Sequence, residues 1–351
     1  MNLANNLSKL PFMLIILAAL ISGILTGWLR LGVELPLLSV YLDHGAMMTG
    51  SFLGTVILIE RIITQKKAWL YAFPLINASS IIFYYLDLRN VAFYCLIVGA
   101  IGLFYIYLRI NNKHSDLPHL LMWIGAACWA IGNIHLLMFQ LYAHSILWWM
   151  AFLLLTIVGE RLELSRFLPL SATKKKLLVA LLVLFLISSI LPFHFGGELL
   201  TGISLILMAF WLLLYDMARK SIKKPGIHQF TAFTLICGFF WLAVSGVFYL
   251  INHTGVISYD ALIHSFFLGF IISMIFAHAP IILPSVLGLT FKPFHRILYV
   301  WVALFQLSLV MRITGGLFTI SVWKLYGGIA NGVAIILFLL SLMSLIVLRK
   351  K

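Results

Sequence analysis

The chain is a series of long apolar segments separated by short junctions that carry charged, Pro or Gly residues. An α-helix needs about 20 apolar residues to cross the hydrocarbon core of a bilayer. Dividing the sequence at these junctions predicts twelve membrane-spanning helices, near residues 10–32, 37–60, 68–86, 90–109, 118–141, 143–160, 175–193, 197–217, 228–251, 258–288, 294–319 and 323–348. The tenth range is overlong and contains Pro280 and Pro284, which fits a short re-entrant or interfacial piece at its end. The predicted fold class is an all-α polytopic membrane protein with a single transmembrane domain over residues 1–351.

The basic residues test this division independently. If the N-terminus is cytoplasmic, all but four of the 24 Lys and Arg residues fall at inner ends or inner loops. Three of the four, Arg30, Arg89 and Lys324, lie on the outer side, and Arg312 lies within the eleventh span. This asymmetry follows the positive-inside rule. It predicts a multi-pass protein of the cytoplasmic (inner) membrane with both termini in the cytoplasm.

Composition excludes several classes of protein. The 351 residues are 63% hydrophobic and 10% charged, with a mean hydropathy of +1.10, whereas soluble domains carry about 25% charged residues. The net charge of +14 is then a consequence of topology, with some attraction to anionic lipid headgroups, and indicates no nucleic-acid partner. The three cysteines lie singly in apolar runs, without the spacing of a zinc or disulfide framework. The first apolar segment lacks a cleavage site and is expected to be a retained span.

A weak internal repeat relates three histidines. Residues 44–61 and 144–161 share a histidine at one end and Glu-Arg at the other, and a fainter copy begins at His264. The three histidines fall on spans two, six and ten at a similar outer depth. We therefore expect three pseudo-repeated units of four helices, approximately residues 1–115, 116–225 and 226–351, arranged around a common centre.

An ionisable residue inside a span is a functional hypothesis by default, because burying it costs free energy unless it is paired or ligated. Neutral imidazole is a common ligand of heme iron and copper. We expect His44 and His264 to hold one heme from both faces, near the outer side of the membrane. His144 and His135 reach a similar depth and would hold a further metal, for which copper is the candidate. Arg312 would bind a heme propionate.

Each of these residues also has a structural interpretation. The histidines could cap helix ends or hydrogen-bond across packed helices, and Arg312 could extend to the interface or pair with a carboxylate. His278, deep in the tenth span, fits either a proton relay or a packed histidine. The Glu60-Arg61 and Glu160-Arg161 dipeptides predict salt bridges at the inner face, each of little energetic weight.

These features resemble the catalytic subunit of heme-copper oxidases and nitric oxide reductases, and the NnrS family of heme- and copper-containing membrane proteins. The similarity rests on the span-two segment DHGAMMTGSFLG (43–54), the stretch 264–284 and the run LVMRI (309–313). It implies that His44 and His264 are the axial ligands of a low-spin b-type heme. It also implies that His144 occupies the position of a copper ligand and that Arg312 binds a propionate.

The sequence differs from those families at the residues that form their oxygen-reducing centre. Residues 174–193 contain no histidine pair, and position 148, one turn after His144, is Trp instead of Tyr. His264 and His278 are fourteen residues apart, roughly 21 Å along a helix, and cannot face two hemes at one level. The resemblance therefore implies electron transfer, or binding of nitric oxide or another diatomic gas, without a complete oxygen-reducing centre. A small redox partner and the lipid bilayer are the expected partners.

Two other classes of function stay open. A twelve-helix secondary transporter has the same predicted span number and termini, although the loop at 60–67 lacks the Gly-Asp-Arg signature of the major facilitator class. A structural or assembly protein would use the same histidines only for helix packing.

Overall fold

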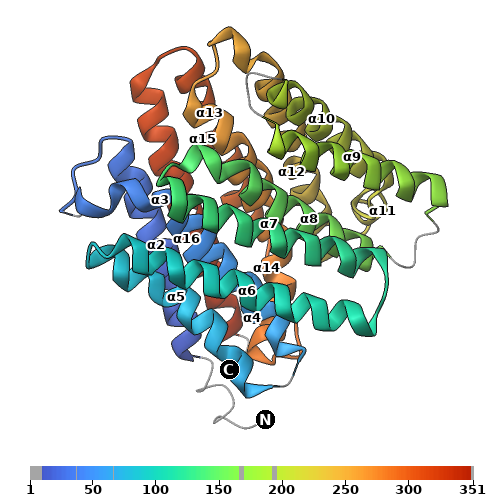
Figure 1. The fold of residues 1–351 in the computed structure, drawn as a ribbon. Helices are drawn as coiled ribbons and strands as arrows, with labels where there is room; N and C mark the ends of the chain where they lie inside the picture. Colours follow the sequence, from blue (N-terminus) through green and yellow to red (C-terminus); the bar gives the residue numbers. More distant parts are fainter. Residues whose placement is uncertain (1–9, 37, 66, 166–169, 192–195, 349–351) are drawn as a thin grey trace. The chain divides into compact units, whose positions relative to one another are not determined.

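The computed structural model describes residues 10–36, 38–65, 67–165, 170–191 and 196–348. Within these ranges the chain is helical and contains no strands (Figure 1). Six of the basic residues used above for topology (Lys9, Lys66, Arg166, Arg349, Lys350 and Lys351) lie outside the described residues. An all-helical fold is what the apolar pattern predicts, because a backbone in lipid must satisfy its hydrogen bonds internally.

Nine helices of the described residues are long and apolar enough to cross a membrane: Val40–Ile63, Arg89–Lys113, Leu117–Phe139, Tyr142–Leu164, Gly197–Tyr215, Ile227–Ile251, Tyr259–Pro284, Ile297–Leu317 and Ser321–Leu348. A shorter apolar helix covers Leu14–Arg30. The length and apolar composition of these helices therefore indicate that the protein is embedded in a membrane. The prediction of twelve spans in three repeated units goes beyond this finding.

The chain divides into two compact units, residues 1–160 with 285–290 and residues 161–284 with 291–351. The elements of the first unit are α2 (Leu10–Arg30), η1 (Leu38–Asp43), α3 (His44–Ala46), η2 (Met47–Gly54), α4 (Thr55–Ile63), η3 (Ala68–Tyr71), α5 (Ala72–Tyr85), α6 (Arg89–Lys113), α7 (Leu117–Phe139), η4 (Tyr142–His144) and most of α8 (Ile146–Leu164). In it α5 packs on α6, α6 on α7, and α2 on η2.

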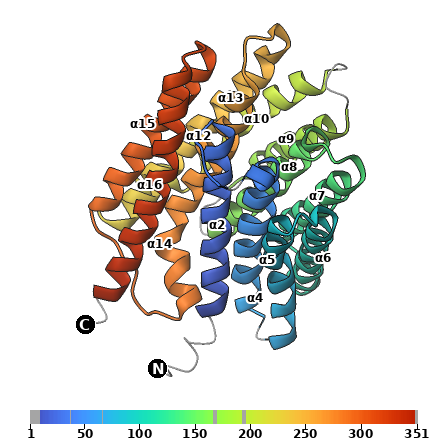
Figure 2. The ribbon, with the colours of Figure 1, turned by 90° about the vertical axis from the view of Figure 1, so that its left-hand side faces the viewer.

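The second unit contains the end of α8 and then α9 (Ala172–Ile190), α10 (Gly197–Tyr215), α11 (Ala218–Ser221), α12 (Ile227–Ile251), η6 (Asn252–Thr254), α13 (Tyr259–His264), η7 (Ser265–Ile272), most of α14 (Ser273–Leu287), α15 (Ile297–Leu317) and α16 (Ser321–Leu348). Here α15 runs alongside α16 (Figure 2), and α10 packs on both α9 and α12. A Cβ on Gly246 would lie 2.7 Å from the Gly202 carbonyl oxygen, so α12 and α10 touch backbone to backbone at this pair. Small residues allow such close approach between helices in lipid.

Two eight-residue stretches of π-helix interrupt the long helices. The stretch η2 begins three residues after His44, and η7 begins directly after His264. A π-turn adds a residue to the helical repeat. Such turns are rare in proteins, and those that occur are frequently found at functional sites. The two histidines that the sequence analysis singles out most strongly thus each precede a π-helical stretch, one in each unit.

Candidate functional site

His44 is held against α2 by a main-chain hydrogen bond. Its Nδ1 lies 2.8 Å from the Gly23 carbonyl oxygen and 3.4 Å from the Thr26 hydroxyl. Because a carbonyl only accepts, Nδ1 carries the proton. In the neutral ring this is the tautomer in which Nε2 has the lone pair that a metal requires. Histidines that ligate metals commonly donate their other N–H in this way.

Gly27 lets the His44 ring approach α2, and Gly23 makes room for the Met48 side chain. A Cβ on Gly27 would lie 2.9 Å from His44 Cε1, and a Cβ on Gly23 would lie 2.2 Å from Met48 Sδ. The two glycines form a Gly-x-x-x-Gly pattern, a known close-packing motif of membrane helices. The role of these glycines was not predicted, although their spacing is visible in the sequence.

Asp43, directly before His44, is buried and forms an ion pair with Arg89 at the start of α6, with Oδ2 and Nε 3.2 Å apart. A buried charge is stable only when paired. The ion pair therefore joins the start of the helix that carries His44 to the start of α6, the fourth predicted span.

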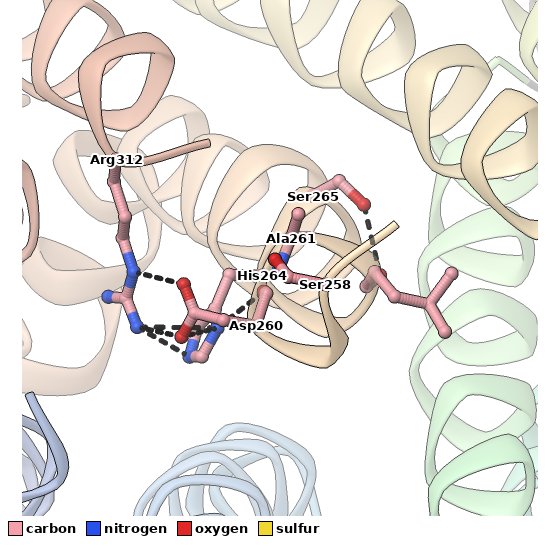
Figure 3. A network of polar contacts seen from close by, with 7 residues as sticks. Ser258, Asp260, Ala261, His264, Ser265 and Arg312 are labelled. Atoms are coloured by element: carbon pink, nitrogen blue, oxygen red, sulfur yellow. Dashed lines mark hydrogen bonds and ion pairs between the residues drawn. The ribbon is translucent and has the colours of Figure 1, made fainter. Parts of the chain in front are cut away.

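His264, Asp260 and Arg312 form a compact network in the second unit (Figure 3). Arg312 donates from Nε and Nη2 to the two carboxylate oxygens of Asp260, at 3.0 and 2.7 Å. The same Nη2 lies 3.3 Å from both ring nitrogens of His264, whose Nδ1 is 2.9 Å from the Asp260 carbonyl oxygen. Arg312 is only 7% exposed, so its charge needs this partner.

Local sequence explains how this network is positioned. Ser258 caps α13, its hydroxyl accepting from the Ala261 backbone N–H at 3.3 Å. Asp260 then falls in the first helical turn, where a negative charge is stabilised by the helix dipole. His264 lies four residues later and so occupies the same helix face. Of the two expected alternatives for Arg312, pairing with a carboxylate is the one observed, and the carboxylate is Asp260.

His135 and His144 lie close together in the first unit. His135 Nδ1 is 3.2 Å from the main-chain oxygen of His144, and both rings contact the ring of Phe139. The His144 side chain is exposed. Among the residues that the structure describes, no group of three or more His, Cys, Asp and Glu side chains could hold a metal ion.

A second arginine network lies at the other end of the tenth predicted span. Arg161 donates from Nε and Nη2 to the Asp216 carboxylate at 2.8 and 2.7 Å, and its Nη1 lies 3.4 Å from His278 Nε2. His278 Nδ1 lies 2.7 Å from the Met274 carbonyl oxygen and therefore donates to it. His278 thus contacts an arginine, a partner that the sequence analysis did not identify.

The salt bridge predicted within Glu60-Arg61 is confirmed, whereas Glu160 and Arg161 of the second dipeptide each pair with a residue outside it. Arg61 pairs with Glu60 at 3.4 Å and with Glu160. Arg161 pairs instead with Asp216, fifty-five residues away in the sequence. No local spacing connects Arg161 with Asp216, so only the fold identifies this pair.

Comparison with protein families gives one match. A model described as a domain of unknown function (DUF8744) matches residues 9–347, which is almost the whole chain. The chain belongs to this family. No curated protein and no solved structure matches it. The DUF8744 description gives no activity, so a functional argument for this chain depends on its own residues.

Proposed function

We propose that the protein is a multi-pass heme protein of the cytoplasmic membrane, with His44 and His264 as the axial ligands of a b-type heme. The heme would supply a redox-active iron, for electron transfer or for binding nitric oxide or another diatomic gas. The observation that carries the proposal is shared by the two histidines. Each precedes a π-helical stretch in its own unit, and each holds a main-chain carbonyl through Nδ1.

The surroundings of the two histidines fit this role unequally. The contact of His44 Nδ1 with Gly23 fixes the ring in the tautomer that a metal requires. His264 has the same kind of Nδ1 contact, but Arg312 Nη2 also lies 3.3 Å from its Nε2. Ligation by His264 therefore requires the guanidinium to move away from the ring. A propionate would offer Arg312 the same bidentate partner that Asp260 offers now.

We include the membrane topology in the same proposal. The chain would cross the membrane twelve times, in three units of four helices, with both termini in the cytoplasm. A second metal, copper being the candidate, would use His144 and His135, and a small redox protein would exchange electrons at the membrane surface. Because the oxygen-reducing histidine set is incomplete in the sequence, we do not propose an oxygen reductase.

Replacing His44 by alanine tests the proposal. The His44→Ala variant should lose the heme that purifies with the unchanged protein, because an axial ligand is removed, while inserting into the membrane normally. The measurement is heme per chain by pyridine hemochrome assay after purification from heme-replete cells. His228→Ala is the matched control, because His228 is exposed at the start of α12 and should leave heme content unchanged. Equal heme content in both variants would contradict the assignment of His44.

A secondary transporter is the second candidate. It is favoured by polar side chains on the helix Tyr259–Pro284 and on the helices packed against it. Between His264 and His278, Ser273 accepts from Gln306 at 3.0 Å, and Gln306 accepts from Trp241 at 2.6 Å. Polar residues within spans frequently mark ion and proton pathways. Colourless protein whose proteoliposomes take up protons, at a rate reduced in Gln306→Leu, would favour transport over heme binding.

A further inference from the structure

A basic cavity of about 420 Å³ lies in the second unit, between the start of α9, the end of α10 and the short helix α11. Four of its lining residues are basic: Lys174, Arg219, Lys220 and Lys223. A cavity with this many cations is expected to attract an anion. It is separate from the histidines that the proposed heme would use.

The acidic residue in the cavity wall does not cancel these charges. Asp216 accepts two hydrogen bonds from Arg161 and a third from the Ala218 backbone N–H at 2.7 Å. Arg161 is buried and is not one of the residues that line the cavity. The Asp216 charge is therefore compensated from behind the wall, and the four basic side chains keep a net positive potential inside the cavity.

Part of the basic set is already held in place. Lys174 Nζ lies 4.5 Å from the ring centroid of Tyr215, another lining residue, in a cation–π contact. The Lys174 carbonyl accepts from Trp211 Nε1 at 3.0 Å. Arg219 Nη1 donates to the Leu214 carbonyl at 3.4 Å. Side chains that are ordered before binding reduce the entropy lost when a ligand enters.

The position of the cavity and its apolar wall indicate the kind of anion. The cavity lies where α9 begins and α10 ends, which the charge asymmetry assigns to the cytoplasmic surface of the membrane. Leu214 and Leu170 also line it, and Leu214 is 51% exposed. Basic pockets between helices on the cytoplasmic side suit phosphate headgroups whose acyl chains extend along the adjacent apolar surface.

We propose that this cavity binds a phosphate-ester anion, of the kind carried by anionic phospholipids of the cytoplasmic leaflet. The lysines and Arg219 contact the phosphate, Tyr215 and Lys174 form one side of the site, and Leu214 borders the acyl chains. The choice of the cytoplasmic leaflet rests on the proposed membrane topology, but the anion site does not depend on heme binding, so either can fail without the other.

The test compares two triple variants of the full-length protein with equal loss of charge. The cavity variant is Lys174→Gln/Lys220→Gln/Lys223→Gln. The control variant is Lys175→Gln/Lys176→Gln/Lys224→Gln, whose positions are exposed sequence neighbours that do not line the cavity. Binding of fluorescent phosphatidylglycerol to detergent-purified protein is measured for both, with phosphatidylcholine, whose zwitterionic headgroup has no net charge, as the reference. We expect the cavity variant to bind phosphatidylglycerol roughly tenfold or more weakly, and the control variant to change little.

Two further arms complete the test. The charge-preserving variant Lys174→Arg/Lys220→Arg/Lys223→Arg should restore binding and so exclude misfolding as the cause of the loss. Inorganic phosphate distinguishes the source of the anion. Binding of phosphate by lipid-free protein that depends on the cavity lysines, without preference for phosphatidylglycerol, would assign the site to a soluble phosphate ester. Equal losses in the cavity and control variants, or equal affinity for the two lipids together with no phosphate binding, would overturn the proposal.

Discussion

An Asp216→Asn variant is expected to lose about 3–5 kcal/mol of unfolding free energy, because it leaves a buried arginine without its counter-charge. Arg161 and Asp216 are each only 5% exposed, and two of the three hydrogen bonds to the carboxylate come from the arginine. Unfolding in mixed micelles of increasing sodium dodecyl sulfate content measures this loss.

Asp87→Asn is the matched control for Asp216→Asn. The Asp87 side chain is 76% exposed and lies 3.8 Å from Arg89, so its removal should cost less than about 1 kcal/mol. The double variant Arg161→Leu/Asp216→Asn should be more stable than Asp216→Asn alone, since the uncompensated charge is then removed. Similar losses for Asp216→Asn and Asp87→Asn would show that the buried pair does not stabilise the fold as described.

Removing Arg312 should destabilise the second unit, because the ion pair between Arg312 and Asp260 is lost. We expect Arg312→Leu and Asp260→Asn each to cost about 2–3 kcal/mol, because each leaves a largely buried charged group without a bidentate partner. The double variant should cost less than the sum of the single variants, with a coupling of about 1–3 kcal/mol. The same unfolding measurement on all four proteins gives the coupling.

Arg312→Lys distinguishes geometry from charge at this site. A lysine keeps the positive charge but cannot make the paired Nε and Nη2 bonds to Asp260, so its stability should lie between those of the unchanged protein and Arg312→Leu. Additive single losses, or a lysine variant as stable as the unchanged protein, would show that the bidentate contact contributes little.

The helices were largely predictable because lipid imposes one strong constraint on the sequence. The segment predicted at 90–109 is α6, Arg89–Lys113, and the segment predicted at 118–141 is α7, Leu117–Phe139. The polar last turn of α6 continues past the apolar run, and hydropathy gives no signal for such a continuation. The π-helical stretches at Met47–Gly54 and Ser265–Ile272 were also not predictable. The spacing of apolar residues in a buried helix does not reveal a change in its hydrogen-bond pattern.

The candidate site was predictable only in part. His264 and Arg312 were both selected from the sequence because ionisable residues are expensive within a span, and the fold brings them together. Asp260 could have been found, since it precedes His264 by four residues on the same helix face. Asp216 as the partner of Arg161 could not, because the contact depends on how α10 packs beside the end of α8 and not on any spacing in the sequence.

A reduced-minus-oxidised visible spectrum of the detergent-purified full-length chain, with a pyridine hemochrome assay for stoichiometry, shows whether this protein carries a b-type heme. We expect a Soret band and a sharp b-type α band, at close to one heme per chain. A colourless protein purified from heme-replete cells would exclude heme binding and leave transport or helix packing as the role of the membrane histidines.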